Sequence, residues 1–482
     1  MTERTRAARP ERVWRGIHRS AAHVDAATPA GRDGQRQGAV QVAPATSATG
    51  SRIRRSAAQV DAATPAGRDG QRQGAVQIAP ATSATGSRIR RSAAQVDAAT
   101  PAGRDRAVDA LRAFAILGVV LGHWLVTALV ADGDGGGLHT ASPLHHMPWL
   151  APISWAFQTL AVFFLVGGHV ATRGYNSARE RGTTYTQWLA SRLSRLFRPV
   201  AAVLSLWTVA SVLLLLSGTE TATVRTLLKL ALSPLWFLLV FAALTAATPL
   251  LRRLHPLWPL AVVLHVDLLR FGLGAPDRLG WVNLAAGWMV PFTVGAAWTR
   301  GELERRRAGW ILLTGGTAAT AALIVRAGYP ASMVGVPGAG VSNLNPPTLA
   351  AVTFGLAQCG LALLLREPLR RAMRRPLAWA AVALLNLSAM TIFLWHQTAL
   401  MATTATALTA GHLPGLHTAP DNLAWVAARL AWLPVFAAAL ALCWTAFRTY
   451  EQGPRRPKGH ASRVVRTHRS HESPKTKAEN HA

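Results

Sequence analysis

The sequence predicts an all-α integral membrane protein with about ten transmembrane helices and a disordered tail at each end. Hydrophobic residues make up 50% of the 482-residue chain, and charged residues only 15%. Long apolar segments follow one another between residues 107 and 447, and short arginine-rich gaps separate many of them. A soluble protein of this length would carry more charge and would not contain such segments.

Residues 1–105 precede the first apolar segment and consist largely of a repeat. The tetrapeptide Arg-Ser-Ala-Ala occurs at 19–22, 55–58 and 91–94, which gives a period of 36 residues. The repeat has too few large apolar residues to bury the core of a solenoid, so we expect a disordered tail. The basic segment 448–482 at the other end is expected to be disordered as well.

The apolar segments between these tails are long enough, or nearly so, to cross ~30 Å of hydrocarbon as helices. The fifth is the weakest, because it is short and contains His265 and Asp267. Tryptophans cluster near the segment ends, as expected at a membrane interface. The ten segments are 107–131, 149–172, 199–217, 233–251, 257–269, 281–299, 309–325, 347–365, 377–405 and 423–447.

Lysine and arginine are distributed unequally over the gaps between these segments. Alternate gaps hold seventeen Lys and Arg on one side and five on the other. Because basic loops stay in the cytoplasm, this predicts a multi-pass protein of the inner (plasma) membrane with both termini in the cytoplasm. The basic gaps are 173–198, 252–256, 300–308 and 366–375.

Several other classes of protein are disfavoured by the same composition. The chain has 51 Lys and Arg against 22 Asp and Glu, but the arginines lie in short gaps between apolar segments, so we expect no nucleic-acid partner. Cys359 and Cys443 both lie in apolar segments and are too few for a disulfide scaffold. His145 and His146 have no third ligand at a metal-binding spacing, so we expect no metal site.

The first apolar segment contains the most unusual polar pair of the sequence, Arg112 and His123. The two residues are eleven positions apart, so on a helix they lie on one face within about 20°, with His123 about 16 Å deeper. Asp109 lies close to the same face. Arg112 alone can serve as a membrane anchor, and His123 can be structural. An ionisable residue inside a membrane is nevertheless most often functional and faces the protein interior.

The segment around this pair, DALRAFAILGVVLGHW at 109–124, is similar to the first-helix signature of the acyltransferase 3 family. Further motifs resemble the family in the same order along the chain, including a segment typical of a high-GC bacterial branch. The resemblance indicates a ten-helix acyltransferase 3-like membrane domain at 106–447. The further motifs are FFLVGGHV at 163–170, RLSRLFRP at 192–199, PLWFL at 234–238, SNLNPPTLA at 342–350 and FLWHQTAL at 393–400.

The resemblance implies a membrane-bound O-acyltransferase that moves an acyl group, usually acetyl, from cytoplasmic acyl-CoA to a hydroxyl of a glycan, glycolipid or secondary metabolite. Acyl-CoA is then a donor substrate, and no tightly bound cofactor is expected. His123 is the candidate general base, and an acyl-His123 intermediate is an alternative. Arg112, Arg192 and Arg195 are candidates to bind the CoA phosphates. His396 is expected to orient the acceptor or to assist proton transfer.

Three further residues are weaker candidates. Trp236 belongs to the motif PLWFL. His169 stands where the family often has an aromatic residue, and packing is its favoured role. Asp267 could pair with Arg270 one turn away. His and Asp residues inside a membrane would also suit a proton-coupled transporter, but the two halves of the sequence show no inverted repeat.

Overall fold

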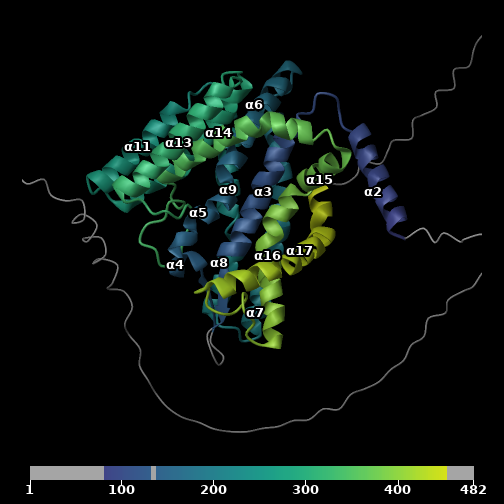
Figure 1. Ribbon diagram of the computed structural model, residues 1–482, viewed down its shortest axis with the longest axis vertical. Coiled ribbons are helices and arrows are strands. Elements are labelled where there is room, and N and C mark those ends of the chain that lie inside the picture. The colour runs from purple at the N-terminus through teal and green to yellow at the C-terminus, as the bar shows by residue number, and fades with distance from the viewer. Residues whose placement is uncertain (1–80, 132–136, 453–482) are drawn as a thin grey trace, which may run out of the picture. The chain divides into compact units, whose positions relative to one another are not determined.

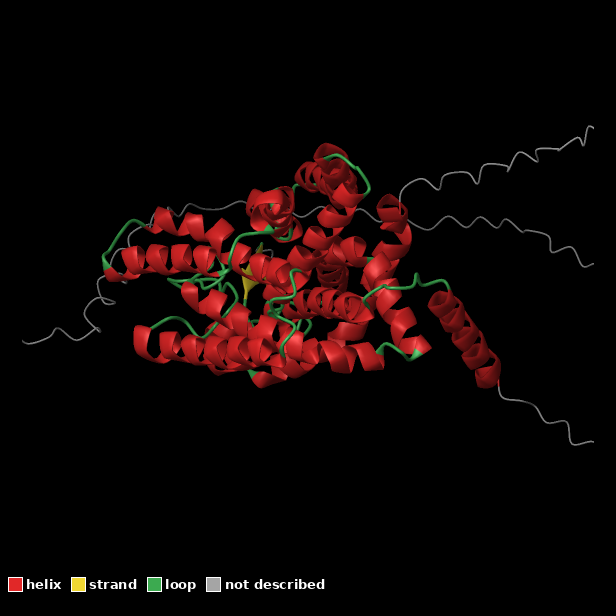
Figure 2. Cartoon of the chain, turned by 90° about the horizontal axis from the view of Figure 1, so that it is seen from above, coloured by secondary structure: helices red, strands yellow, loops and turns green. Residues whose placement is uncertain are grey.

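The computed structural model describes residues 81–131 and 137–452, and nearly all regular structure there is helical (Figures 1 and 2). The predicted all-α class is therefore confirmed. The longer helices are α2 (Ala81–Ala98), α3 (Arg106–Val126), α6 (Leu160–Glu180), α7 (Tyr185–Leu216), α8 (Thr221–Leu232), α9 (Leu235–Ala246), α11 (Leu257–Asp267), α12 (Val282–Thr299), α13 (Arg306–Ala327), α14 (Leu349–Ala372), α15 (Pro376–Leu387), α16 (Ala389–Ala407) and α17 (Leu423–Gln452).

Short elements connect these helices. Strands β1 (Ala128–Ala131) and β2 (Leu138–Ala141) follow α3 directly and pair antiparallel, with Ala128 opposite Ala141. The remaining short elements are the helices α4 (Pro143–His146), α5 (Ala151–Ser154) and α10 (Thr248–Leu251), and the turns η1 (Pro148–Leu150), η2 (Trp155–Phe157), η3 (Leu268–Gly272), η4 (Asp277–Trp281) and η5 (Leu408–Ala410).

The chain divides into a unit of residues Met1–Ile89 and a unit of residues Arg90–Ala482. Most of the tail predicted to be disordered lies outside the described residues, as does the segment 453–482. The structure differs from the prediction where the second repeat copy joins the third, because residues 81–98 form helix α2. Alanine-rich sequence favours a helix here, and Asp97 forms an ion pair with Arg106 at 2.6 Å.

The predicted count of ten spanning helices is not reached in the described part of the chain. Seven spans are long and apolar enough, and the pair α15 with 389–410, bent by 72°, makes an eighth if counted as one. All ten predicted segments contain helix, but 257–269 and 281–299 do not qualify. Helix α11, in the first of these segments, is too short. Helix α12, in the second, is buried along most of its length, so the side chains of α12 pack against protein and need not be uniformly apolar.

Several predicted boundaries also shift. The predicted loop 173–198 is mostly helical, because α6 continues to Glu180 and α7 begins at Tyr185. A capping box formed by Thr184 and Gln187 starts α7. Arg225 lies inside the span Thr221–Ala246, although the prediction assigned it to a loop.

Glycines allow α6 and α12 to pack with their backbones in contact. A Cβ atom on Gly168 would lie 1.9 Å from the carbonyl oxygen of Phe292, and one on Gly295 would lie 2.0 Å from that of Leu165. Small residues serve this purpose in membrane helices, where close packing replaces the hydrophobic effect as the driving force. The two helices are thus closely packed, and α6 also contacts α3.

Helix α3 contacts α6, α14, α15, α16 and α17 and is held at both ends. Asp105 caps its N-terminus by accepting hydrogen bonds from the backbone N–H groups of Ala107 and Val108. At its C-terminus the fully buried Arg429 of α17 donates to the carbonyl oxygens of Trp124, at 2.6 Å, and of Thr127. The negative end of the helix dipole favours a cation at this position.

Arg429 has further partners that compensate its burial. Its Nη1 donates to the carbonyl oxygen of Gly415 at 2.8 Å. The guanidinium carbon lies 5.3 Å from the ring centroid of Trp425 and 4.9 Å from that of Phe436. Carbonyl oxygens and aromatic faces thus replace a counter-ion, and the side chain links α17, the loop 411–422 and the end of α3.

We predict that Arg429→Ala destabilises the protein by roughly 2–4 kcal/mol, because it leaves buried carbonyl oxygens without donors. Arg429→Lys should fall between the wild type and the alanine variant, since an ammonium cannot reproduce the fork of donors. Unfolding followed in detergent micelles measures both. Arg448→Ala is the control, because this arginine of the same helix is exposed. Equal stability of Arg429→Ala and Arg448→Ala would contradict the prediction.

Candidate active site

One face of α3 lines two separate cavities in succession. Arg112 and Ile116 line the first, which we call the arginine cavity, and Val119, His123 and Val126 line the second, the histidine cavity. These positions follow one another at steps of four and three residues, which is the spacing of a single helix face. The shared face predicted for Arg112 and His123 is thus observed, and the two side chains open into different cavities.

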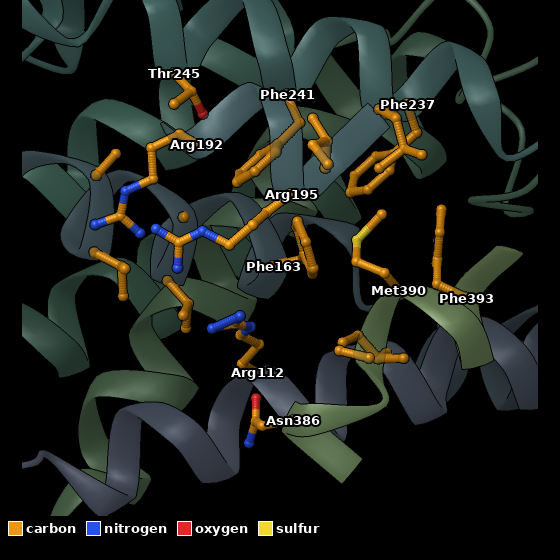
Figure 3. A pocket seen from close by; sticks show the side chains of 18 of the residues that line it. Arg112, Phe163, Arg192, Arg195, Phe237, Phe241, Thr245, Asn386, Met390 and Phe393 are labelled. Carbon is orange, nitrogen blue, oxygen red and sulfur yellow. The ribbon is translucent and has the colours of Figure 1, made fainter. Parts of the chain in front are cut away.

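The arginine cavity has a volume of about 190 Å³, and its charged and aromatic side chains lie toward different ends. Figure 3 shows the side chains of Arg112 from α3 and of Arg192 and Arg195 from α7 toward one end, with Phe237 and Phe393 toward the other. Among the described residues that line it there is no Asp or Glu. The structure therefore brings together all three predicted phosphate-binding arginines on one cavity.

Two uncharged polar side chains complete the arginine cavity. Asn386 of α15 donates through Nδ2 to the carbonyl oxygen of Asp109 at 2.8 Å, while its buried Oδ1 has no hydrogen-bond partner. The hydroxyl of Thr245 is also buried without a partner. Both side chains line the cavity, so each has hydrogen-bonding capacity left for a molecule bound there.

The histidine cavity has a volume of about 310 Å³, and its mostly apolar lining also carries uncharged polar groups. His123 is partly exposed to it and is the one ionisable side chain among its described lining residues. Aromatic side chains, including the predicted Trp236, form part of its wall. The uncharged polar residues that line it are Thr127, Thr140, Ser154, Gln158, Ser233, Asn345 and Gln397.

His123 contacts two consecutive residues of α16. Its ring centroid lies 5.1 Å from that of His396, and its Nδ1 lies 3.0 Å from the side-chain amide of Gln397. His396 is fully buried, and its Nδ1 lies 2.6 Å from the carbonyl oxygen of Phe393. A carbonyl only accepts, so Nδ1 of His396 carries the proton and its Nε2, which has no partner, keeps a lone pair.

The protonation of His123 depends on how the amide of Gln397 is oriented. If the amide nitrogen faces Nδ1 of His123, the neutral imidazole carries its proton on Nε2. If the amide oxygen faces it, Nδ1 carries the proton and Nε2 becomes a free base. The oxygen Oε1 of Gln397 is buried and has no partner in the first orientation. The second orientation gives that oxygen a donor and prepares His123 to accept a proton.

Asp109 and His169 line neither cavity. Asp109 accepts hydrogen bonds from Nε and Nη2 of Arg104 at 2.6 and 3.2 Å, so its carboxylate is engaged in an ion pair. The ring of His169 stacks on Trp298 with centroids 4.2 Å apart and contacts the hydroxyl of Thr299 at 3.0 Å. The geometry of His169 is that of a packed aromatic residue.

Asp267 also lies away from both cavities, at the centre of a hydrogen-bond network. It accepts from Asn283 at 2.9 Å, from the hydroxyl of Tyr329 at 3.0 Å and from the backbone N–H of Leu349 at 2.7 Å. Burial and the neighbouring carboxylate raise the pKa of the Tyr329 phenol, so it remains a donor. The expected pair with Arg270 differs in the structure, where Arg270 contacts Asp277 at 3.3 Å.

Sequence reasoning missed four residues that the structure brings to the site. Gln397 contacts His123, Phe237 and Phe393 line both cavities, and Arg429 holds the end of α3 behind His123. Gln397, Phe237 and Phe393 lie inside the motifs PLWFL and FLWHQTAL, where only Trp and His had been singled out. A lone arginine in the last apolar segment was the available signal for Arg429.

Comparison with known proteins identifies the family of the chain. The family model of the acyltransferase 3 domain, described as an acyltransferase domain, matches residues 105–448. No curated protein and no solved structure matches the chain. The match covers well over half of the 482 residues, including both cavities and every residue that lines them. The chain therefore belongs to the acyltransferase 3 family and is a multi-pass membrane acyltransferase.

Proposed function

We propose that this acyltransferase moves an acetyl group from cytoplasmic acetyl-CoA to a hydroxyl of a glycan, glycolipid or secondary metabolite. One observation carries the proposal. A cavity with three arginines and a cavity with one histidine adjoin along a single face of α3. The arginine cavity offers guanidinium groups that can bind the phosphates of a donor. The histidine cavity offers an imidazole base beside uncharged polar groups.

The arginine cavity suits the donor. Guanidinium groups bind phosphate oxygens through paired hydrogen bonds, and CoA carries several phosphates. The apolar walls beyond the arginines suit the pantetheine arm and the acyl group. Asn386 and Thr245 are available for the amide groups of that arm, since each has a buried polar atom without a partner.

The acceptor binds in the histidine cavity on this proposal. Arginine-rich gaps identify the cytoplasmic side, and Arg192 and Arg195 belong to the most basic of them. The arginine cavity then opens toward the cytoplasm, and the acceptor approaches from the opposite side of the inner (plasma) membrane. Both termini are cytoplasmic in this orientation.

The reaction requires a base for the acceptor hydroxyl. His123 accepts the hydroxyl proton while the hydroxyl oxygen attacks the carbonyl carbon of the thioester. The carbon–sulfur bond then breaks, and the imidazolium returns the proton to the departing thiolate, which gives an ester and free CoA. Gln397 holds His123 in the required tautomer through its amide oxygen. His396 is fully buried and lines neither cavity, so the lone pair on its Nε2 can act on the acceptor only through the neighbouring ring of His123.

Proton-coupled transport was the alternative from the sequence. It needs a relay of intramembrane His and Asp residues. Asp109 is paired with Arg104 and Asp267 is bound by three donors, and neither lines a cavity with His123. Family membership and this separation both favour acyl transfer.

We predict that His123→Ala lowers acyl transfer at least about 10²-fold, the usual effect of losing a general base. Radiolabelled acetyl transfer by purified protein to membrane extract of the host cells measures this. Binding of acetyl-CoA should persist, because the arginines lie in the other cavity. His169→Phe is the matched control and should retain activity, since His169 lines neither cavity and packs on Trp298 and Thr299. Near-normal turnover of His123→Ala would exclude the base role.

We also predict that Arg112→Ala raises KM for acetyl-CoA about tenfold or more, because one charge-assisted phosphate contact is lost. Arg112→Lys should restore KM only in part, since an ammonium lacks the planar fork. Steady-state kinetics with acetyl-CoA as the varied substrate checks both. Arg198→Ala is the control, because Arg198 is exposed and lines neither cavity. An unchanged KM in Arg112→Ala would separate this arginine from donor binding.

A further inference from the structure

Two aromatic side chains lie where the two cavities meet. Phe237 of α9 and Phe393 of α16 are the residues common to both linings in the described part of the chain. Their ring centroids are 5.3 Å apart, and the side chains are almost fully buried, with 3% and 6% of their surface exposed. These two rings, which we call the aromatic pair, therefore separate the arginine cavity from the cavity that contains His123.

Other rings pack behind Phe237, while the ring of Phe393 packs on Phe237 and on His396, with the latter centroids 6.0 Å apart. The ring centroid of Phe237 lies 5.0 Å from that of Phe163 and 5.0 Å from that of Phe164. Phe164 in turn stacks on Trp288 at 5.0 Å and has no exposed surface. Close-packed interiors of this kind do not accept an added methylene without displacing their neighbours. The rings behind Phe237 therefore limit how far it can move when a longer group lies against it.

We propose that Phe237 and Phe393 set the length of the acyl group that the enzyme transfers, by limiting the space around the acyl chain as its carbonyl reaches His123. This inference rests on the proposed function. The thioester carbonyl has to lie near His123 for attack, so the chain attached to it lies against the pair. On this proposal an acetyl methyl group is accommodated beside the pair, and each further methylene has to displace a packed ring.

The same position explains why the pair can tune specificity without disturbing the base. Phe393 holds His396 through its backbone carbonyl oxygen, which a side-chain substitution leaves in place. The guanidinium groups lie at the other end of the arginine cavity, so donor phosphates are bound independently of the pair (Figure 3). Substitution should therefore change the preference among acyl groups rather than the affinity for CoA.

The test compares acetyl-, propionyl- and butyryl-CoA as donors for the purified full-length protein. Host-cell membrane extract supplies the acceptor, and release of free CoA is the readout. The wild type should prefer acetyl- to propionyl-CoA by about 10- to 200-fold in kcat/KM, the range for one methylene in a closed pocket. Phe237→Leu and Phe393→Leu should each reduce this preference about tenfold or more, mainly through kcat for the longer donors.

Phe292→Leu is the matched control, because it removes a fully buried ring that lines neither cavity. It should keep the wild-type preference. If Phe237→Leu and Phe393→Leu both keep the wild-type preference for acetyl- over propionyl-CoA, the inference is overturned. Equal use of acetyl- and butyryl-CoA by the wild type also overturns it, without any variant. Failure of the wild type to release CoA from acetyl-CoA would instead refute the proposed function on which the inference depends.

Discussion

The arrangement of this protein depends on one constraint: a single helix, α3, carries a guanidinium and an imidazole inside an apolar bundle. Neither group tolerates contact with lipid tails, so the face that bears Arg112 and His123 has to be turned inward. Helices α6, α7, α9 and α16 contribute other lining residues to the two cavities along it. Asp105 and Arg429 hold the two ends of α3, which fixes its rotation and depth in the bundle.

Much of the fold and part of the site could be predicted, because their signals lie close together in the sequence. Apolar segments predicted the helices, and the eleven-residue spacing predicted the shared face of Arg112 and His123. The basic motif at 192–199 predicted two of the arginines that line a cavity with Arg112. Each of these inferences needs only helix periodicity or local composition.

The remaining features depend on contacts between distant segments and could not be predicted. The apolar segment 281–299 was predicted to span the membrane, whereas its helix α12 is buried against protein along most of its length, which only the folded structure reveals. The bend between α15 and α16 coincides with a hydrogen bond from Trp444 to Ser388, and the role of Arg429 depends on carbonyl oxygens about 300 residues earlier. For Gln397, only the folded structure reveals that it faces His123.

On the proposed function, the two cavities open to opposite sides of the membrane and adjoin at Phe237 and Phe393. Arg195 and Asn345 are exposed and line the arginine and histidine cavities, respectively. Arg195→Cys and Asn345→Cys, each made after Cys359 and Cys443 are replaced by Ala, can be treated with a membrane-impermeant maleimide in sealed vesicles. In right-side-out vesicles the maleimide should label only the Asn345→Cys protein, and in inverted vesicles it should label only the Arg195→Cys protein. Labelling of both from the same side would contradict the account.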